Sequence, residues 1–396
     1  MDIDDLEPRL ALVASYSVIA SDPRVQRQVD WLAGDDWIVN TVGLGKDDSP
    51  NIRRHFELAP PSKWVASKLG YAITGRFLPR KLAFRLQLLN RVPEAVRRSV
   101  ENGKYDLIVL NETEFLPWLS DRRALGKSAE RGHIHVDLHE AHRGDRRRDT
   151  VGAKIAAPYY KWRHSHIGHP RIDTRSVVNE PIGKMYVDEF GIEPPQPILN
   201  VPALEELAPV ERKDGEIRLL FHGMPAKQRG FQEIIGAMGA LPDNFTVDFM
   251  LMPRPEIHAW LQRLIGSSPA RERMRIVPPS PVREIAKRIN RYDLEVIYYP
   301  HVSPNLINSL PNKFFESIQA RLGIVTRPDG LMGHMVQKWE NGILVPGFSA
   351  ENLADSLRGL TSADIQRMKQ ASDRVARKVN AENEGQEFLR IVSESQ

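Results

Sequence analysis

Short apolar runs alternate with amphipathic stretches along the first half of the chain. The apolar runs cover Leu10–Ser17, Trp37–Gly43, Tyr105–Asn111 and His133–Leu138, and a helical period appears over Arg24–Gly34. Alternation of strands and helices at this spacing predicts a doubly wound α/β fold with a parallel sheet. Ligands of such sheets bind beyond the carboxyl ends of the strands.

A second alternation follows a proline-rich stretch at 193–197. The two halves differ in sequence, yet both indicate a Rossmann-like domain. We therefore predict an N-terminal domain over 1–195, a linker over 196–210, a C-terminal domain over 211–375 and a helix over 376–396 that packs back on the first domain. The elements of the second domain are a helix from Phe231 and strands at Ile217–Phe221, Thr246–Met252, Met274–Val277, Leu294–Tyr299 and Ile324–Thr326.

Length and composition bound the class of protein. A chain of 396 residues is too long for one compact core and suggests two domains. The absence of Cys excludes a disulfide, a thiolate nucleophile and a Cys-ligated metal. We expect no metal site, because neither Asp2-Ile3-Asp4 nor the His164, His166 and His169 group has a convincing ligand pattern. An acidic N-terminus followed directly by a strand argues against a signal peptide, so a cytoplasmic protein is expected.

Positive charge is concentrated between positions 51 and 100. This stretch has eleven Lys or Arg residues against Glu57 and Glu94, with large apolar residues interleaved at roughly helical spacing. Such a segment, at 63–98, could lie on an anionic membrane at the inner face. It could equally be a helical layer that covers the sheet and has a solvated basic face. No recognition motif accompanies the charge, so nucleic acid is not an expected partner.

The stretch from Asn308 to Glu316 points to an anion site. It follows the strand-like run Leu294–Pro300 and leads into a helix whose first N–H groups lack intrahelical partners. Pro311 costs that helix no hydrogen bond at its start. Glu316 lies one turn inside, where it could accept hydrogen bonds from hydroxyls beside the anion. Phosphate plus a diol is what a nucleotide sugar presents, although an ordinary β–loop–α unit with a solvated Glu316 fits this segment equally well.

A second loop, from Gly223 to Gly230, also has the residues of a phosphate site. A strand ends at Gly223, the loop contains Lys227 and Arg229, and Gly230 permits a tight turn into the next helix. An Arg here could bind a diphosphate in bidentate fashion. A basic surface turn is the alternative.

These two segments resemble glycosyltransferase family 4, whose members have the GT-B fold. Gly223 and Arg229-Gly230 are similar to that family's Gly-Arg…Lys-Gly loop, and Pro311 to Glu316 matches its Pro-Asn-Lys-Phe-x-Glu helix. The resemblance implies two Rossmann-like domains with parallel sheets facing across a central cleft. It also implies that the second domain binds a nucleoside-diphosphate sugar, with the donor-binding residues Gly223, Lys227, Arg229, Asn308, Asn312, Lys313 and Glu316.

The chain departs from the family pattern at two positions. Met224 stands where the family usually has Arg, so one phosphate contact is missing or comes from Lys227. Asn308 stands where the first Glu of the Glu-x7-Glu element is usual. An amide there still donates and accepts hydrogen bonds but has no charge.

The resemblance extends to the first domain, which would bind the acceptor. His139 follows the strand His133–Leu138, and the resemblance places it near the donor sugar; a loop-capping His is the alternative. Arg24, Glu140 and Arg143 are candidate acceptor-binding residues. The candidate catalytic residues are His139, Arg229 and Glu316.

The resulting expectation is a metal-independent glycosyltransferase without a cofactor. It would move a sugar from the nucleotide donor to a hydroxyl of a glycan, lipid-linked or small-molecule acceptor, with retention, in cell-envelope, polysaccharide or glycoconjugate synthesis. A nucleotide-sugar epimerase on the same fold and a non-catalytic nucleotide-sugar-binding subunit remain alternatives.

Overall fold

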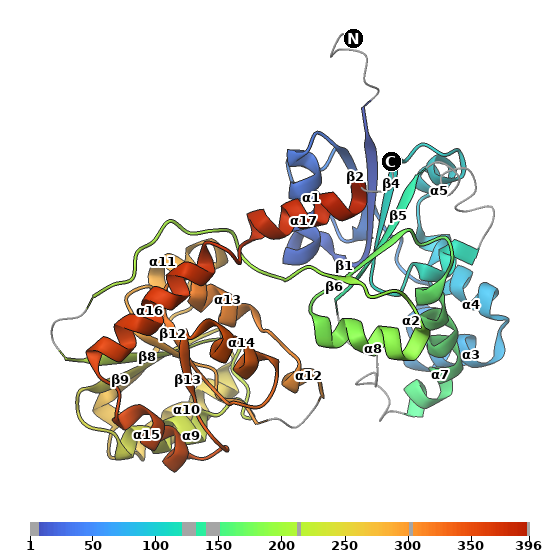
Figure 1. The fold of residues 1–396 in the computed structure, drawn as a ribbon. Helices are drawn as coiled ribbons and strands as arrows, with labels where there is room; N and C mark the ends of the chain where they lie inside the picture. The colour runs from blue at the N-terminus through green and yellow to red at the C-terminus, as the bar shows by residue number, and fades with distance from the viewer. Residues whose placement is uncertain (1–7, 121–131, 140–150, 212–214, 301–303, 394–396) are drawn as a thin grey trace, which may run out of the picture. The chain divides into compact units, whose positions relative to one another are not determined.

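The computed structural model describes residues 8–120, 132–139, 151–211, 215–300 and 304–393. The chain divides into two compact units, Met1–Asn200 with Glu384–Gln396, and Val201–Asn383. Each unit has its own parallel sheet with helices in the connections between strands (Figure 1).

The first unit contains a seven-stranded sheet in the order β3-β2-β1-β4-β5-β6-β7. All of its strand pairs are parallel. Its central strands β4 and β5 are buried along their whole length, which explains the apolar run of β4. The polar residues of β5, His133, His135 and Asp137, have hydrogen-bond partners in the core. The strands are β1 (Leu10–Val18), β2 (Ile38–Leu44), β3 (Arg54–Glu57), β4 (Leu107–Asn111), β5 (His133–Leu138), β6 (Thr174–Val177) and β7 (Gln196–Pro197).

Helices α1, α2, α3 and α8 of the first unit each begin at a capping side chain. Helix α1 starts because the Asp22 side chain accepts hydrogen bonds from the N–H groups of Arg24 and Val25, with Pro23 at the first helical position.

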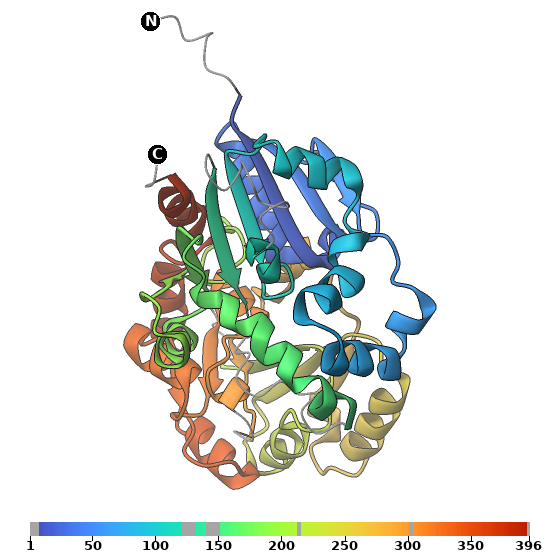
Figure 2. The ribbon, with the colours of Figure 1, turned by 90° about the vertical axis from the view of Figure 1, so that its right-hand side faces the viewer.

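Helix α7 lies beside α3, as Figure 2 shows for the green and blue helices. The helices are α1 (Pro23–Gly34), α2 (Lys63–Ala66), α3 (Lys68–Phe77), α4 (Arg80–Gln87), α5 (Glu94–Glu101), α7 (Val151–His164) and α8 (Glu180–Phe190).

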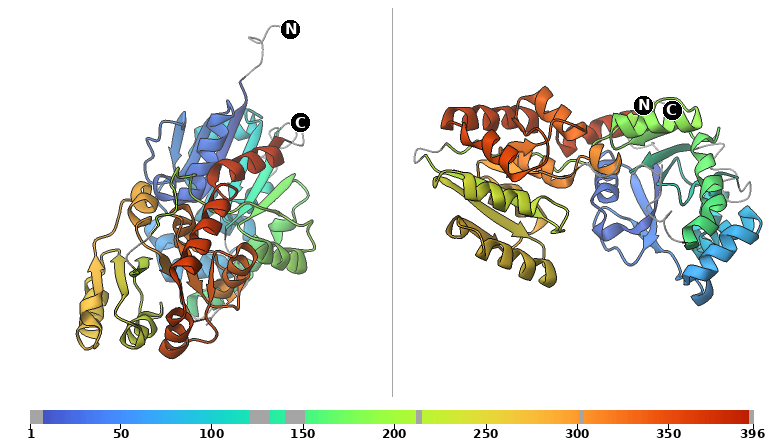
Figure 3. Two further views of the ribbon diagram at one scale, coloured as in Figure 1. Left: turned by 60° about the vertical axis from the view of Figure 1, so that its left-hand side comes forward. Right: turned by 90° about the horizontal axis from the view of Figure 1, so that it is seen from below.

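The last helix, α17 (Ala381–Ser393), completes the core of the first unit. The Phe388 ring packs 5.6 Å from the Trp31 ring and edge-on to the His135 ring at 5.3 Å. Gly385 allows this close approach, because a Cβ there would lie 2.5 Å from the Trp31 ring. Helix α17, at the red end of the chain in Figure 3, therefore packs against residues from the beginning of the chain.

The second unit contains a six-stranded parallel sheet in the order β10-β9-β8-β11-β12-β13. The strands are β8 (Ile217–Gly223), β9 (Phe245–Leu251), β10 (Met274–Val277), β11 (Leu294–Val296), β12 (Gly323–Thr326) and β13 (Gly342–Leu344). The helices are α9 (Phe231–Ala240), α10 (Pro255–Gly266), α11 (Ile285–Ile289), α12 (Pro304–Ile307), α13 (Asn312–Gln319), α14 (Leu331–Trp339), α15 (Ala350–Arg358) and α16 (Ser362–Ala376).

Three details differ from the sequence-based expectation. Residues 196–197 lie in strand β7 and not in the linker, since an edge strand tolerates Pro197, which has no N–H to donate. Strand β11 ends at Val296 instead of Tyr299. Strands β3, β6 and β13 were not predicted, because each has only three or four residues and no strong alternation.

Candidate functional site

The sheet of the second unit has its crossover point between β8 and β11, where the strand order reverses. Ligands of doubly wound sheets bind at this point, outside the carboxyl ends of the strands. Strand β8 ends here with His222 and Gly223, and α13 begins a few residues after β11. The two segments that the sequence singled out therefore belong to one site.

The first turn of α13 is free of side-chain caps. Pro311 is the N-cap residue and its side chain makes no cap hydrogen bond. Lys313, the second residue of the helix, is only 5 % exposed. Its Nζ makes no hydrogen bond with the described residues; it lies 3.5 Å from the Phe221 ring centroid and 3.6 Å from Glu295 Oε1. A buried ammonium with unused donors beside a helix N-terminus is suited to an anion.

Glu316 is held by a buried histidine. His222 lies between two carboxylates: its Nδ1 is 2.9 Å from Glu295 Oε2, and its Nε2 is 2.9 Å from Glu316 Oε2. Burial alone would lower the pKa of His222, but the charge and hydrogen bond of Glu295 and the hydrogen bond of Glu316 raise it to about 9. The imidazole is therefore an imidazolium at neutral pH.

The loop after β8 approaches α13 closely. Gly223 has a φ of +105°, and a Cβ at this position would lie 3.6 Å from Lys313 Cε. Gly230 has a φ of +74°, and a Cβ there would lie 2.1 Å from the Tyr298 carbonyl oxygen. No other residue fits at Gly230 without moving the loop.

The two cations of this loop point to different aromatic rings. Arg229 lies over the Tyr299 ring, 5.2 Å from its centroid, and donates to the Tyr299 hydroxyl at 3.3 Å. Lys313 Nζ is 5.7 Å from the centroid of the same Tyr299 ring, so the Arg229 and Lys313 side chains both lie near Tyr299. Lys227 is exposed and lies over the Trp260 ring at 5.7 Å.

The remaining predicted donor residues lie around the start of α13. Asn312 is exposed as the first residue of the helix, and Asn308 is half-buried in the turn after α12. The structure thus brings Gly223, Lys313 and Glu316 together with His222. Arg229 joins them through Tyr299, while Lys227 is directed toward Trp260.

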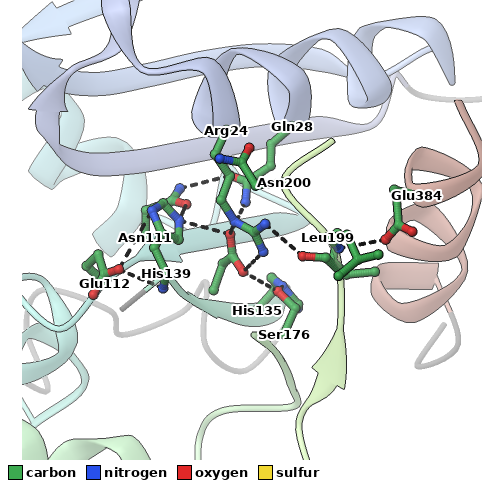
Figure 4. A network of polar contacts seen from close by, with 12 residues as sticks. Arg24, Gln28, Asn111, Glu112, His135, His139, Ser176, Leu199, Asn200 and Glu384 are labelled. Carbon is green, nitrogen blue, oxygen red and sulfur yellow. Dashed lines mark hydrogen bonds and ion pairs between the residues drawn. The ribbon is translucent and has the colours of Figure 1, made fainter. Parts of the chain in front are cut away.

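In the first unit, Asp137 is the centre of a buried polar network near the end of β5. Figure 4 labels its partners Arg24, Gln28, His139 and Ser176. Arg24 donates to both carboxylate oxygens, each at 2.6 Å, and Ser176 and Gln28 donate to them at 2.6 and 2.5 Å. Burial would raise the pKa of Asp137, but the Arg24 charge, with a contribution from His139, holds it well below its usual range. Asp137 is therefore a buried carboxylate that organises its neighbours.

His139 is fixed by this network. Its Nε2 is 3.0 Å from Asp137 Oδ2 and 2.9 Å from Asn111 Oδ1, and its backbone N–H donates to Glu112 at 2.6 Å. Burial would lower the pKa of His139, but the charge and hydrogen bond of Asp137 raise it. Glu112 itself has a φ of +62°, a strained conformation for this residue type.

The candidate acceptor-binding residue Arg24 lies in the core. It is only 4 % exposed, and its guanidinium donates to Asp137 and to the Ile198 carbonyl at 2.8 Å. Arg24 is buried because the Asp137 carboxylate would otherwise have no cation beside it in the core. Glu140 and Arg143 lie outside the described residues.

Sequence reasoning missed His222, Glu295 and Asn111. Glu295 had a detectable signal, because it is a charged residue inside an otherwise apolar run, and such a residue needs a buried partner. His222 and Asn111 had none, since each ends an apolar strand where polar residues are common.

The described part of the chain has neither a metal-binding cluster nor a membrane-spanning helix. It contains no group of three or more His, Asp or Glu residues arranged to hold a metal ion. Among the same residues, no helix has the length and apolar character that crossing a membrane requires.

Comparisons with known proteins identify the fold. No protein-family model matches the chain, and no curated protein sequence matches it significantly. Among solved structures, HepE from Anabaena in complex with UDP is similar over 97 % of this chain and 99 % of its own, with a TM-score of 0.67 at 11 % identity. WaaG, a glycosyltransferase involved in lipopolysaccharide biosynthesis, is similar over 97 % of this chain and 100 % of its own, with a TM-score of 0.62 at 13 % identity.

Sucrose-phosphate synthase from Thermosynechococcus elongatus is similar over 97 % of this chain and 98 % of its own, with a TM-score of 0.63 at 16 % identity. At these identities the likeness establishes the fold. The chain has the two-domain α/β architecture of the GT-B proteins, with one parallel sheet in each domain.

Proposed function

We propose that this protein is a glycosyltransferase that moves a sugar from a nucleoside-diphosphate donor to an acceptor hydroxyl. The observation that carries the proposal is Lys313, a buried ammonium without a hydrogen-bond partner among the described residues, at the start of α13 and beside the crossover point of a GT-B sheet. A diphosphate would supply the missing acceptors. The neighbouring Glu316 carboxylate would then accept hydrogen bonds from the ribose.

The chemistry follows from where charge develops. As the bond from the sugar to the diphosphate breaks, the leaving group gains negative charge. Lys313, Arg229 and the first N–H groups of α13 would stabilise it, a role supported by the position of both cations near Tyr299. Lys227 would approach the outer phosphate after leaving the Trp260 ring. These cations would do the work of a metal ion, so we propose metal-independent transfer.

The finer assignments rest on the sequence resemblance to glycosyltransferase family 4. They are retention at the anomeric carbon, a role of His139 at the reacting centre, and acceptor binding by the first unit. The same resemblance places the reaction in cell-envelope, polysaccharide or glycoconjugate synthesis. Two of the similar structures are in keeping with this proposal. WaaG is a glycosyltransferase involved in lipopolysaccharide biosynthesis, and HepE was crystallised in complex with UDP.

Replacing Arg229 by Ala should reduce turnover about ten- to a hundredfold, because a charge-assisted hydrogen bond to phosphate is worth roughly 1.5–3 kcal/mol. Release of nucleoside diphosphate from a panel of nucleotide sugars and acceptors would measure it. Arg271→Ala, which removes an exposed arginine of the same unit, is the matched control. Full turnover in a folded Arg229→Ala protein would exclude Arg229 from the site.

The acceptor is proposed to lie at a lipid surface, which the helices α2, α3 and α4 would contact. Five of the eleven exposed large hydrophobic residues of the described chain occur between positions 64 and 86: Trp64, Leu69, Phe77, Leu82 and Leu86. Phe77 is 73 % exposed and Leu69 66 % exposed. Six Lys or Arg residues accompany them between 63 and 86, and no acid occurs there.

The spacing places apolar and basic residues on shared helix faces. In α4, Lys81, Leu82, Arg85 and Leu86 are exposed, while Ala83 and Phe84 are buried. Helix α3 turns Gly75 toward α7, where a Cβ would lie 3.3 Å from Tyr159 Cβ. Apolar side chains that enter the headgroup region beside cations that meet anionic lipid are the features of an interfacial segment. We propose that this surface binds an anionic membrane at its cytoplasmic face.

Reversing Lys63, Arg76, Lys81 and Arg85 to Glu should abolish sedimentation with vesicles that contain phosphatidylglycerol. Each cation near such a surface contributes about 1 kcal/mol, so four losses weaken binding by about a thousandfold or more. The matched control reverses Arg271, Lys287, Arg288 and Arg358, which are exposed cations of the second unit. Wild-type protein that stays in the supernatant at low salt would refute the lipid surface.

A further inference from the structure

His222 is a residue of the donor site that neither the family resemblance nor the sequence pattern singled out. It ends strand β8 with its side chain 3 % exposed, and it bridges Glu295 of β11 to Glu316 of α13. Its backbone N–H also donates to Glu295 Oε1 at 3.1 Å. The imidazole therefore ties the helix that contains Glu316 to the two central strands of the sheet.

Both ring nitrogens face carboxylate oxygens at 2.9 Å. A neutral imidazole has one N–H and one lone pair, so it could donate to only one of these carboxylates. The other oxygen would then face a lone pair at hydrogen-bond distance, in a place where water has little access. With both nitrogens protonated, each carboxylate receives a hydrogen bond. Between two ionised carboxylates, this geometry therefore favours an imidazolium.

The charges around His222 come from two elements, β11 and α13. Glu295 is fully buried on β11; Glu316 and Lys313 project from α13, with the Glu316 side chain 17 % exposed. Two cations and two carboxylates leave this cluster neutral when His222 is protonated. Loss of that proton would leave one negative charge in excess, directly beside the place proposed for the diphosphate. Such a charge opposes binding of an anion.

We propose that His222, as an imidazolium, is a positioning residue that holds the Glu316 carboxylate in the orientation that receives the donor ribose. Among the described residues, the hydrogen bond to His222 uses only Oε2 of Glu316. Oε1 is left for a ribose hydroxyl. Glu295 fixes the opposite side of the ring, so the chain Glu295–His222–Glu316 sets the carboxylate in advance. This inference rests on the proposed function. It states that the part of the donor affinity that comes from the ribose hydroxyls depends on His222, although His222 itself does not contact the ligand.

The test compares UDP with 2′,3′-dideoxy-UDP by titration calorimetry on the full-length protein, from about pH 7 to about pH 10. The ratio of the two dissociation constants reports on the ribose hydroxyls, because titration of the base and phosphates affects both ligands. In the wild type, UDP should bind roughly ten- to a hundredfold more tightly near neutral pH. The preference should decline as pH rises through about 9, where the His222 pKa lies.

His222→Gln should show a small preference at every pH, since an amide donates to one carboxylate without titrating in this range. If that variant is poorly folded, the double substitution His222→Leu with Glu295→Leu removes the imidazolium together with its buried counterion, and it should show the same flat, small preference. His222→Asn has a shorter side chain, so it tests independently whether the amide must reach a carboxylate.

The outcomes separate the inference from the proposed function. A wild-type preference that does not change with pH, or one that survives in folded His222→Gln protein, overturns the role of His222 while nucleotide binding stands. If the wild type binds neither UDP nor GDP, nor their dideoxy analogues, the proposed donor site fails and the role of His222 fails with it.

Discussion

Lys313→Met should lower kcat for sugar transfer by about 10²–10³-fold while the protein stays folded. Removing one donor that stabilises developing charge in a water-poor site has an effect of this size. Lys313 Nζ makes no hydrogen bond with the described residues, and Met retains most of the apolar stem over Phe221. His222 still pairs with Glu295, so the loss of stability is limited to the 3.6 Å ion pair between Lys313 and Glu295. Nucleoside-diphosphate release measures the rate, and urea unfolding measures the stability.

The matched control is Lys287→Met, which removes an exposed lysine paired with Glu205 in the same unit. We expect it to change neither rate nor stability appreciably, since exposed ion pairs contribute about 0–1 kcal/mol. If Lys313→Met retains the wild-type rate, the anion site at α13 is not catalytic. Severe unfolding of Lys313→Met, with the rate per folded molecule unchanged, would make Lys313 a structural cation.

Arg24→Met should lower the free energy of unfolding by about 3–5 kcal/mol, because it leaves Asp137 as a buried carboxylate without its cation. The pair is among the most enclosed in the described chain, with the two side chains 5 % and 0 % exposed. His139 should also lose its fixed position, since Asp137 is its hydrogen-bond partner. Urea unfolding at neutral pH measures the first effect.

The pH dependence identifies the cause. The low pKa of Asp137 stabilises the wild type above the ordinary pKa of a carboxyl, and this stabilisation is lost as pH falls. In Arg24→Met the carboxyl takes up a proton more readily, so the difference between the two proteins should shrink on acidification. Arg98→Met, which breaks an exposed pair with Glu94, should cost less than about 1 kcal/mol. A difference in stability that is constant with pH would mean lost packing and not an uncompensated charge.

Sequence reasoning reached the fold because the alternation of buried strands and helices is strong. The runs at Leu10–Ser17, His133–Leu138 and Met274–Val277 coincide with β1, β5 and β10 to within a residue or so. The interior strands β1 and β5 are largely buried, so their apolar residues are set by their position in the sheet. Short edge strands such as β7 have no such requirement, and their sequences hold no comparable signal.

The candidate site was predictable only where local structure defined it. Gly230 and the start of α13 follow from backbone constraints that residue types reveal directly. Long-range pairs do not: Arg24 and Asp137 are separated by 113 positions, and His222 and Glu316 by 94. Which buried cation meets which buried carboxylate depends on the order of strands in the sheet, and one sequence does not contain that order explicitly.

The most direct test of the central claim is the melting temperature of the protein across a panel of nucleoside diphosphates and their sugars. A ligand at a hundred times its dissociation constant stabilises the folded protein by about 2.7 kcal/mol, which gives a clear upward shift. We predict such a shift for at least one nucleoside diphosphate in the wild type, and its loss in Lys313→Met. Absence of a shift with every member of the panel, or an equal shift in Lys313→Met, would contradict the account.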